Sequence, residues 1–485
     1  MLSKTRSPIQ ENSNDRNAQG FRVLLLGKRA KVRFLLSCLG SGLLAISTLT
    51  AQSQFQGSVS TDAPSAAPIT LSLREAITRG LRTNLGLLVS ISESEVTRGA
   101  RLRALSALLP SLDANAGETV EQSNLQAVGI NVPTIPTIVG PFHYTDVRGY
   151  MSWNVFDYSA RKNYRATQEN RRAAQLAVSD ARDLVVQAVA SAYLQITTDA
   201  SRVEATRSQV TTSIALYTRA EDQRQAGTAA KIDVLRAQVE IKQQQQRLLA
   251  QDNQLAKDKL VLARIIGLPD GQEFNLAESV PFAVLRPMTL DEAFAAASRK
   301  RADLQSCQAR VRAADEALKA ARAERYPTAD ISANYGDIGT SLANSHGTFT
   351  VTASAKVNLF NGGRIAGDIV QAQAQLKERQ DELADLTGQI KQQIRSAFLD
   401  ITSAADQVAV ARDNLDLPSQ TLVQSRDRFA AGMTDNIEVV QAQEAVASAS
   451  DQLISALYAH NFAKVALARS LGGAEQGIQQ MLELK

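Results

Sequence analysis

The sequence predicts a mainly helical chain that also contains four amphipathic β-strands, with the whole arrangement repeated in tandem. Three observations lead to this prediction. Short motifs recur at fixed offsets, paired segments alternate apolar and polar residues, and two segments of about 68 residues contain almost no residues that favour turns. Alternation with a period of two indicates strands, whereas small apolar residues at three-to-four spacing indicate long helices.

The net charge of the chain comes from its first residues. The 485-residue sequence carries 53 basic and 49 acidic residues, a formal net charge of +4, and residues 1–53 alone contribute +6. The rest of the chain therefore carries −2 (+4 minus +6), which removes the main support for nucleic-acid binding.

The residue inventory also excludes several kinds of active site. Two cysteines, one of them within the first 53 residues, exclude a disulfide framework, and three scattered histidines exclude a histidine cluster. The sequence contains no P-loop, dinucleotide-binding loop, HExxH motif or GxSxG elbow. We therefore predict that the protein is not an enzyme and has no catalytic residue, no cofactor and no metal site.

Residues 1–53 are predicted to be a secretory signal peptide. A basic segment, residues 28–33, precedes an apolar run over residues 34–51, and small residues at Ala51 and Ser53 suit a cleavage site. A single transmembrane anchor is the alternative, but the run is short for a span and contains several serines and glycines. Residues 54–69, rich in Ser, Gln and Ala, are predicted to form a disordered tether.

The remaining chain is predicted to be a tandem duplication, with one copy in residues 70–267 and the other in residues 288–473. Residues 71–77 recur as residues 288–294 at an offset of 217, whereas Gly227 and Gly267 recur as Gly432 and Gly472 at an offset of 205. The difference places a loop about a dozen residues longer between residues 117 and 143 of the first copy. Residues 268–287 are predicted to be a connector and residues 474–485 a C-terminal tail.

Each copy is predicted to contain two strands, at about 110–118 and 143–156 in the first copy and about 327–336 and 347–360 in the second. Within residues 348–359 the alternation is complete. The apolar members are Phe349, Val351, Ala353, Ala355, Val357 and Leu359, and the polar members are Thr348, Thr350, Thr352, Ser354, Lys356 and Asn358. Such strands match those of membrane barrels, with lipid outside and water inside.

This interpretation requires more than one chain. Strands in a membrane must close into a barrel so that every backbone group is paired, and four strands cannot close. Two chains would supply eight strands and three chains would supply twelve.

A shorter helix precedes each strand pair, and a very long helix follows it. The long helices are predicted at residues 158–226 and 362–431, and return helices at residues 231–266 and 436–471 follow the turns at Gly227 and Gly432. Pro418 is predicted to kink or interrupt the second long helix. Long alanine-rich helices alone would also be consistent with a periplasmic coiled-coil adaptor or a structural rod. A rod, however, would not require strands inserted at matching points of the two copies.

The doubled motifs resemble the TolC family of outer-membrane efflux proteins. They are Arg224-Gln225-Ala226-Gly227-Thr228 with Asp233, and Phe429-Ala430-Ala431-Gly432-Met433 with Glu438, each acid lying six residues after the glycine. The strand-to-helix segment 358–364 and the closing segment 262–267 also look like that family. The resemblance covers about residues 70–473.

The resemblance implies a homotrimer in the bacterial outer membrane. Its twelve-stranded β-barrel, surrounded by lipid, would continue into a twelve-helix α-barrel that forms a tunnel in the periplasm. The channel would belong to a tripartite efflux or type I secretion system and would passively conduct substrates from an inner-membrane transporter and a periplasmic adaptor, or membrane fusion, protein to the exterior.

The resemblance also implies sites at the periplasmic end. Adaptor docking would involve Ala226, Gly227, Thr228, Ala431, Gly432 and Met433. The family narrows its tunnel there with acidic residues, and the matching positions are Glu438, which is acidic, and Gln441, which is not; Asp233 is the first-copy counterpart of Glu438. Because a carboxylate in the first turn of a helix also stabilises the helix dipole, a structural role for Glu438 stays open.

Overall fold

The computed structural model describes residues 54–60, 63–65, 67–130, 133–277, 288–434 and 436–482. The chain divides into two units, Met1–Gln54 and Phe55–Lys485. The predicted signal peptide, residues 1–53, lies outside the described residues, as does the second half of the predicted connector, residues 278–287. The fold described below belongs to the second unit.

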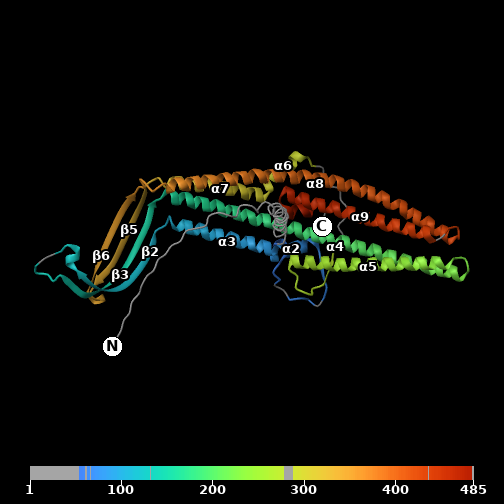
Figure 1. Ribbon diagram of the computed structural model, residues 1–485, viewed down its shortest axis with the longest axis horizontal. Coiled ribbons are helices and arrows are strands. Elements are labelled where there is room, and N and C mark those ends of the chain that lie inside the picture. Colours follow the sequence, from blue (N-terminus) through green and yellow to red (C-terminus); the bar gives the residue numbers. More distant parts are fainter. Residues whose placement is uncertain are drawn as a thin grey trace, which may run out of the picture. The chain divides into compact units, whose positions relative to one another are not determined.

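Within this unit, the same succession of helices and strands occurs twice (Figure 1). The first copy contains α2 (Leu73–Thr83), α3 (Leu85–Ser106), β2 (Ser111–Asn124), β3 (Ile138–Phe156), α4 (Tyr158–Gln225) and α5 (Lys231–Ile266). The second contains α6 (Leu290–Lys300), α7 (Ala302–Ala323), β5 (Thr328–Gly339), β6 (Ser345–Lys356), α8 (Arg364–Ala430) and α9 (Asn436–Leu471). Corresponding helices have 11 and 11, 22 and 22, 68 and 67, and 36 and 36 residues, as a duplicated sequence predicts.

The helix before each strand pair is broken in two, which the sequence analysis missed. The breaks lie at Asn84 and Arg301, where the backbone is extended, and these positions are separated by the repeat offset of 217. Asn84 accepts a hydrogen bond from the Gly86 amide at 3.0 Å and donates one to the Phe55 carbonyl at 2.7 Å. At the first break, the Asn84 side chain that caps the next helix therefore also marks the end of the previous one, whereas Arg301 forms no such side-chain cap.

Four strands form one antiparallel sheet in the order β2-β3-β5-β6. Directly opposed residues on neighbouring strands share a face of the sheet. One face carries a row of Leu112, Met151, Ala333 and Val351 and a row of Ala114, Gly149, Tyr335 and Phe349. The other face carries a row of Ser111, Ser152, Ser332 and Thr352 and a row of Asp113, Tyr150, Asn334 and Thr350. The register therefore extends the alternation predicted for β6 to all four strands.

The strand bounds differ from the predicted ones at both ends of the sheet. β2 and β3 stay paired as far as Asn124 and Ile138, because the longer loop of the first copy begins as a continuation of the hairpin. β6 ends at Lys356, so Val357, Asn358 and Leu359 lie outside it and their predicted assignment to a strand was wrong. The backbone leaves the sheet there toward Gly362 and Gly363, which both have positive φ and precede α8.

The long helices match their predicted bounds to within two residues. Gly227 and Gly432 follow them with φ of +75° and +71°, the left-handed conformation predicted for both. α8 continues through Pro418, so of the two predicted effects of this proline the interruption was wrong, and the kink stays a prediction. Next to the proline, the Ser419 hydroxyl donates to the Leu415 carbonyl at 2.7 Å and the Thr421 hydroxyl to the Leu417 carbonyl at 2.9 Å.

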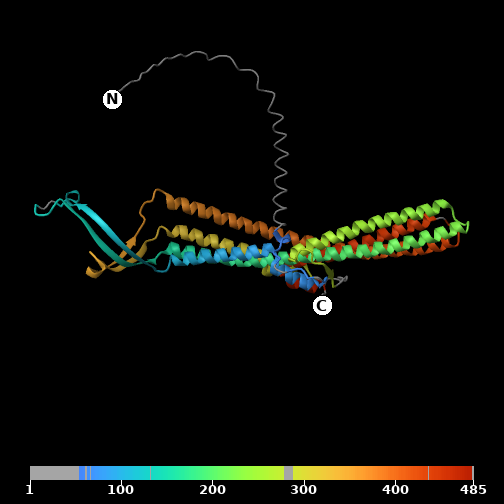
Figure 2. The ribbon, with the colours of Figure 1, turned by 90° about the horizontal axis from the view of Figure 1, so that it is seen from below.

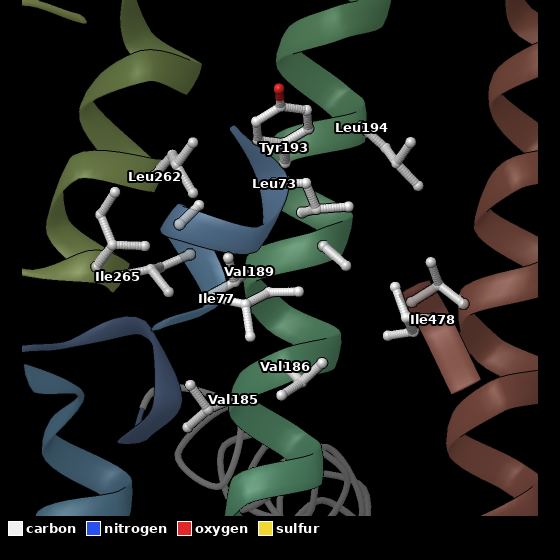
Figure 3. Packing of buried hydrophobic residues seen from close by; sticks show 14 of the residues in the cluster. Leu73, Ile77, Val185, Val186, Val189, Tyr193, Leu194, Leu262, Ile265 and Ile478 are labelled. Atoms are coloured by element: carbon white, nitrogen blue, oxygen red, sulfur yellow. The ribbon is translucent and has the colours of Figure 1, made fainter. Parts of the chain in front are cut away.

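The largest apolar cluster lies where α2, α4, α5 and α9 meet (Figure 3). Leu73 and Ile77 of α2 pack there with Val189 of α4 and Leu262 of α5, and all four are almost completely buried. The cluster also contains Ala474, Ile478 and Leu482 from the end of the chain. The predicted C-terminal tail, residues 474–485, is therefore wrong for its first eight residues, because α10 (Ala474–Met481) packs into the core. Asp183 of α4 fixes this helix by accepting hydrogen bonds from the Gly473 and Ala474 amides.

The predicted tether and connector are also partly ordered. The Val59 amide donates to the Thr83 carbonyl and the Leu85 amide to the Gly57 carbonyl, both at 2.9 Å. β1 (Ile69–Leu71) begins at the last residue of the predicted tether and pairs in parallel with β4 (Phe274–Leu276), within the predicted connector. The Ser-, Gln- and Ala-rich composition suggested disorder for the tether, but its backbone bonds to Thr83 and Leu85 and the β1–β4 pair order part of it. Among the described helices, none combines the length and the apolar character needed to cross a bilayer.

Candidate functional site

The sheet and the two helix turns lie at opposite ends of the long helices (Figure 2). The polar face of the sheet is connected across strands by side-chain hydrogen bonds. Arg148 of β3 donates to Asn334 of β5 at 2.6 Å and to Thr348 of β6 at 2.8 Å, and it pairs with Asp146 at 3.2 Å. Ser354 of β6 donates to Asp330 of β5 at 2.8 Å. These groups suit a surface that faces water.

The apolar face has the opposite character. Leu112, Tyr335, Phe349 and Val351 lie on this face with 64–78% of their surface exposed. Large apolar residues in such a continuous row are costly in water, so this face requires lipid or another apolar surface.

The two edge strands of the sheet are β2 and β6. Within the described residues β2 pairs only with β3, and β6 pairs only with β5. Each edge therefore presents unpaired backbone groups over more than ten residues. An edge of this kind can pair with the edge of another copy.

The first turn joins α4 to α5. The Thr228 amide and hydroxyl both donate to the Gln223 carbonyl, at 2.9 Å and 3.0 Å, while the Gly227 amide donates to Arg224. Ala226, Gly227 and Thr228 are exposed. Hydrogen bonds from Arg224 and Gln225 lower the pKa of Glu221 to about 2, so this carboxylate is charged at physiological pH.

The second turn joins α8 to α9 and repeats this geometry. The Met433 amide donates to the Arg428 carbonyl at 2.9 Å and the Gly432 amide to Phe429 at 3.1 Å. Ala431, Gly432 and Met433 are exposed, and Met433 has 71% of its surface accessible. The residues predicted to dock an adaptor therefore lie together at two exposed turns.

Glu438 lies in the first turn of α9 and is bound within its own chain. Thr434 donates to its carboxylate at 2.6 Å, and Arg428 and Ser425 of α8 lie at 3.2 Å and 3.3 Å. The Thr434 hydrogen bond first, and then the Arg428 charge and Ser425, hold the pKa of Glu438 below its usual value. No sequence motif indicated Arg428 and Ser425, because they precede Glu438 by 10 and 13 residues and lie across the turn rather than on the same helix face.

The other two predicted constriction residues differ from Glu438. Asp233 pairs with Arg236 at 3.5 Å, and only 13% of its side chain is exposed. Gln441 is exposed on α9. The two turns are joined to each other, because Asn436 donates to the Asp233 carbonyl at 3.1 Å and Gln223 to the Phe429 carbonyl at 3.4 Å.

Comparison with known proteins gives a consistent result. The chain matches the outer membrane efflux protein family over residues 95–268 and 295–473. It is 24% identical over 298 residues to the pyoverdine export outer membrane protein OpmQ of Pseudomonas putida KT2440 and 23% identical over 433 residues to the probable efflux pump outer membrane protein SepC of Pseudomonas putida F1. These alignments cover 59% and 84% of this chain, and 62% and 84% of the relatives.

The fold is also shared with solved structures. The CmeC outer membrane channel of Campylobacter jejuni superposes with a TM-score of 0.72 at 15% identity, covering 89% of this chain and 95% of that one. The resemblance to the TolC family is thereby confirmed. The chain belongs to the outer membrane efflux protein family: it is an outer-membrane efflux protein, and its four-stranded sheet and long helices share the fold of the solved outer membrane channel.

Proposed function

We propose that three copies of this chain form the channel-tunnel of a tripartite efflux or type I secretion system. The channel conducts substrates passively from an inner-membrane transporter and a periplasmic adaptor to the exterior. The observation that carries this proposal is the four-stranded sheet with one polar face, one apolar face and two open edges. A sheet of this kind satisfies its backbone in a membrane only when copies join edge to edge, and three copies give twelve strands.

The helix turns supply the proposed contact with the adaptor. Both turns expose a glycine between small or flexible residues, and a Cβ added at Gly227 or Gly432 would meet no atom within 4 Å. Open backbone at a helix end leaves room for the helices of a partner protein. A coiled-coil adaptor or a structural rod, the alternative from the helices alone, leaves the amphipathic sheet without a role.

The proposed channel activity is tested by reconstituting the purified full-length protein in planar bilayers. We expect discrete ion-conducting steps that require the detergent-extracted oligomer and that a heat-dissociated sample does not produce. If the intact oligomer inserts into the bilayer and conducts nothing, the channel proposal is wrong.

Glu438 is proposed to take part in the constriction at the closed periplasmic end. Threefold symmetry would bring three copies around one axis, where like charges attract cations. Glu438→Gln removes one negative charge per chain and releases Arg428, so we expect altered single-channel conductance and weaker block by multivalent cations. The matched control is Asp233→Asn, which changes the corresponding carboxylate of the first copy. Unchanged conductance and block in Glu438→Gln would leave only the role in stabilising the turn.

A further inference from the structure

Four exposed arginines lie where the strands of the sheet join the helices. Arg161 and Arg165 are the fourth and eighth residues of α4, whereas Arg322 lies in the last turn of α7 and Arg325 shortly after it. Within the described residues, none of the four side chains forms an ion pair or a hydrogen bond. Because a guanidinium group is always charged, this junction carries four positive charges that the described part of the chain does not pair.

The nearest acidic residues along the chain have partners of their own. Asp157 caps the start of α4 through its side chain. Glu169 pairs with Arg312 at 2.7 Å, and Glu324 pairs with Arg364 at 2.8 Å. The four arginines are therefore available to an anion from outside the chain.

Arg161 and Arg165 face away from the side of the helices that would line a tunnel. α3, α4, α7 and α8 neighbour one another in that order, and a cavity of about 710 Å³ is lined by residues of all four, including Asn163 and Thr167 of α4. A single cavity that reaches four helices side by side lies on the concave side of their layer, and a closed tunnel encloses that side. Each arginine precedes one of these lining residues by two positions, which correspond to about 200° of rotation around the helix. Both arginines therefore point to the outer side.

Aromatic side chains lie between these arginines and the apolar face of the sheet. Phe156, the last residue of β3, lies opposite Ala329 on that face. The rings of Tyr158 and Tyr326 follow and pack edge to face, with their centroids 5.8 Å apart. Tyr158 precedes Arg165 by seven residues, about two helical turns, so the two share one side of α4. Aromatic residues in such a position are typical of the boundary between a membrane and water.

We propose that the four arginines bind the phosphate groups of anionic phospholipids in the membrane leaflet that faces the periplasm. Acyl chains contact the apolar face of the sheet, the aromatic residues lie at the boundary, and the guanidinium groups donate charge-assisted hydrogen bonds to the phosphates. A lipid, and not soluble phosphate, is the occupant because the charged surface continues directly into a surface that requires acyl chains. This inference rests on the proposed channel function, in which the apolar face contacts lipid, and adds the class of lipid bound at the periplasmic boundary.

The single tryptophan of the chain, Trp153, reports which lipid occupies this boundary. It lies on the apolar face, level with Ile331 and Ala353, and precedes Phe156 by three residues. At 3.3 Å per residue it is about 10 Å inside the boundary, where bromine atoms in the middle of an acyl chain quench its fluorescence.

The purified oligomer is placed in vesicles of equal parts phosphatidylglycerol and phosphatidylcholine, with bromine on only one of the two lipids at a time. The ratio of the two degrees of quenching gives the relative affinity of the lipids for the surface around Trp153. We expect a preference for phosphatidylglycerol of about threefold or more.

Charge removal distinguishes this site from a general attraction of the protein to an anionic bilayer. Arg161→Gln combined with Arg165→Gln should lower the preference by about twofold or more, whereas Arg161→Lys combined with Arg165→Lys should retain most of it. The matched control is Arg219→Gln combined with Lys257→Gln, which also removes two exposed cations that form no ion pair in the described part of the chain. These residues lie near the far end of α4 and on α5, so we expect the control variant to keep the wild-type preference.

Equal quenching by the two brominated lipids around the wild-type oligomer would overturn the proposed lipid site. An equal loss of preference in the control variant, or a preference that survives both glutamine substitutions in α4, would contradict it as well. Quenching by neither brominated lipid would instead overturn the contact of the apolar face with lipid, and with it the proposed function on which this inference rests.

Discussion

Ala353→Arg should reduce the yield of assembled protein in outer membranes strongly, whereas Ser354→Arg should reduce it little. The two residues are neighbours on β6 at nearly the same depth but lie on opposite faces of the sheet. Ala353 shares its row with Ile331 and Trp153, and Ser354 bonds to Asp330. An arginine that faces lipid costs about 2–4 kcal/mol at the midplane and less near the interfaces, whereas one that faces the lumen costs much less.

A second pair controls for depth. Val351→Arg and Thr352→Arg repeat the comparison one row further along the strand, where Val351 is level with Ala333 and Thr352 with Ser332. The amount of heat-modifiable oligomer in isolated outer membranes is the measurement. Equal tolerance of arginine on both faces would contradict the assignment of the apolar face to lipid.

Gly227→Trp and Gly432→Trp should abolish export while leaving oligomer assembly intact. Both glycines have positive φ and both turns are exposed, so a tryptophan there points away from the core and into the proposed adaptor contact. The local cost to folding is limited to backbone strain of about 1–2 kcal/mol. Export is measured as accumulation of a substrate or as loss of resistance in a strain that lacks the chromosomal copy.

Gly227→Ala and Gly432→Ala are the matched controls for this result. Alanine imposes the same strain at positive φ but adds only a methyl group, for which there is open space at both positions. We expect the alanine variants to export nearly as well as the wild type. Normal export by both tryptophan variants would show that the turns do not dock a partner.

The sequence was sufficient to locate the elements that are determined by their own residues rather than by contacts with distant parts of the chain. Gly227 and Gly432 mark the turns because the chain that reverses there needs left-handed backbone. The period of two in residues 348–356 shows which residues of β6 share a face of the sheet. The repeat then located the corresponding elements of the other copy, since α5 and α9 have equal lengths.

Elements that depend on distant partners could not be predicted in this way. α10 has eight residues with a glycine inside and forms because Asp183, about 290 residues earlier, binds its first amides. β1 and β4 have three residues each and exist only as a pair. The same applies to the candidate site: the resemblance to the TolC family identified Glu438. It did not identify Arg428 on the other side of the turn, or the bond from Asn436 to the Asp233 carbonyl that joins the two turns.

The most direct test of the central proposal, an outer-membrane channel built from three copies, is the location and native mass of the full-length protein expressed at normal levels. Membrane fractionation followed by native mass spectrometry in detergent gives both quantities. We predict recovery in the outer membrane, extraction only by detergent, and a mass of three chains that falls to that of one chain on heating. A soluble, elongated monomer in the periplasm would contradict the proposal and favour a structural rod.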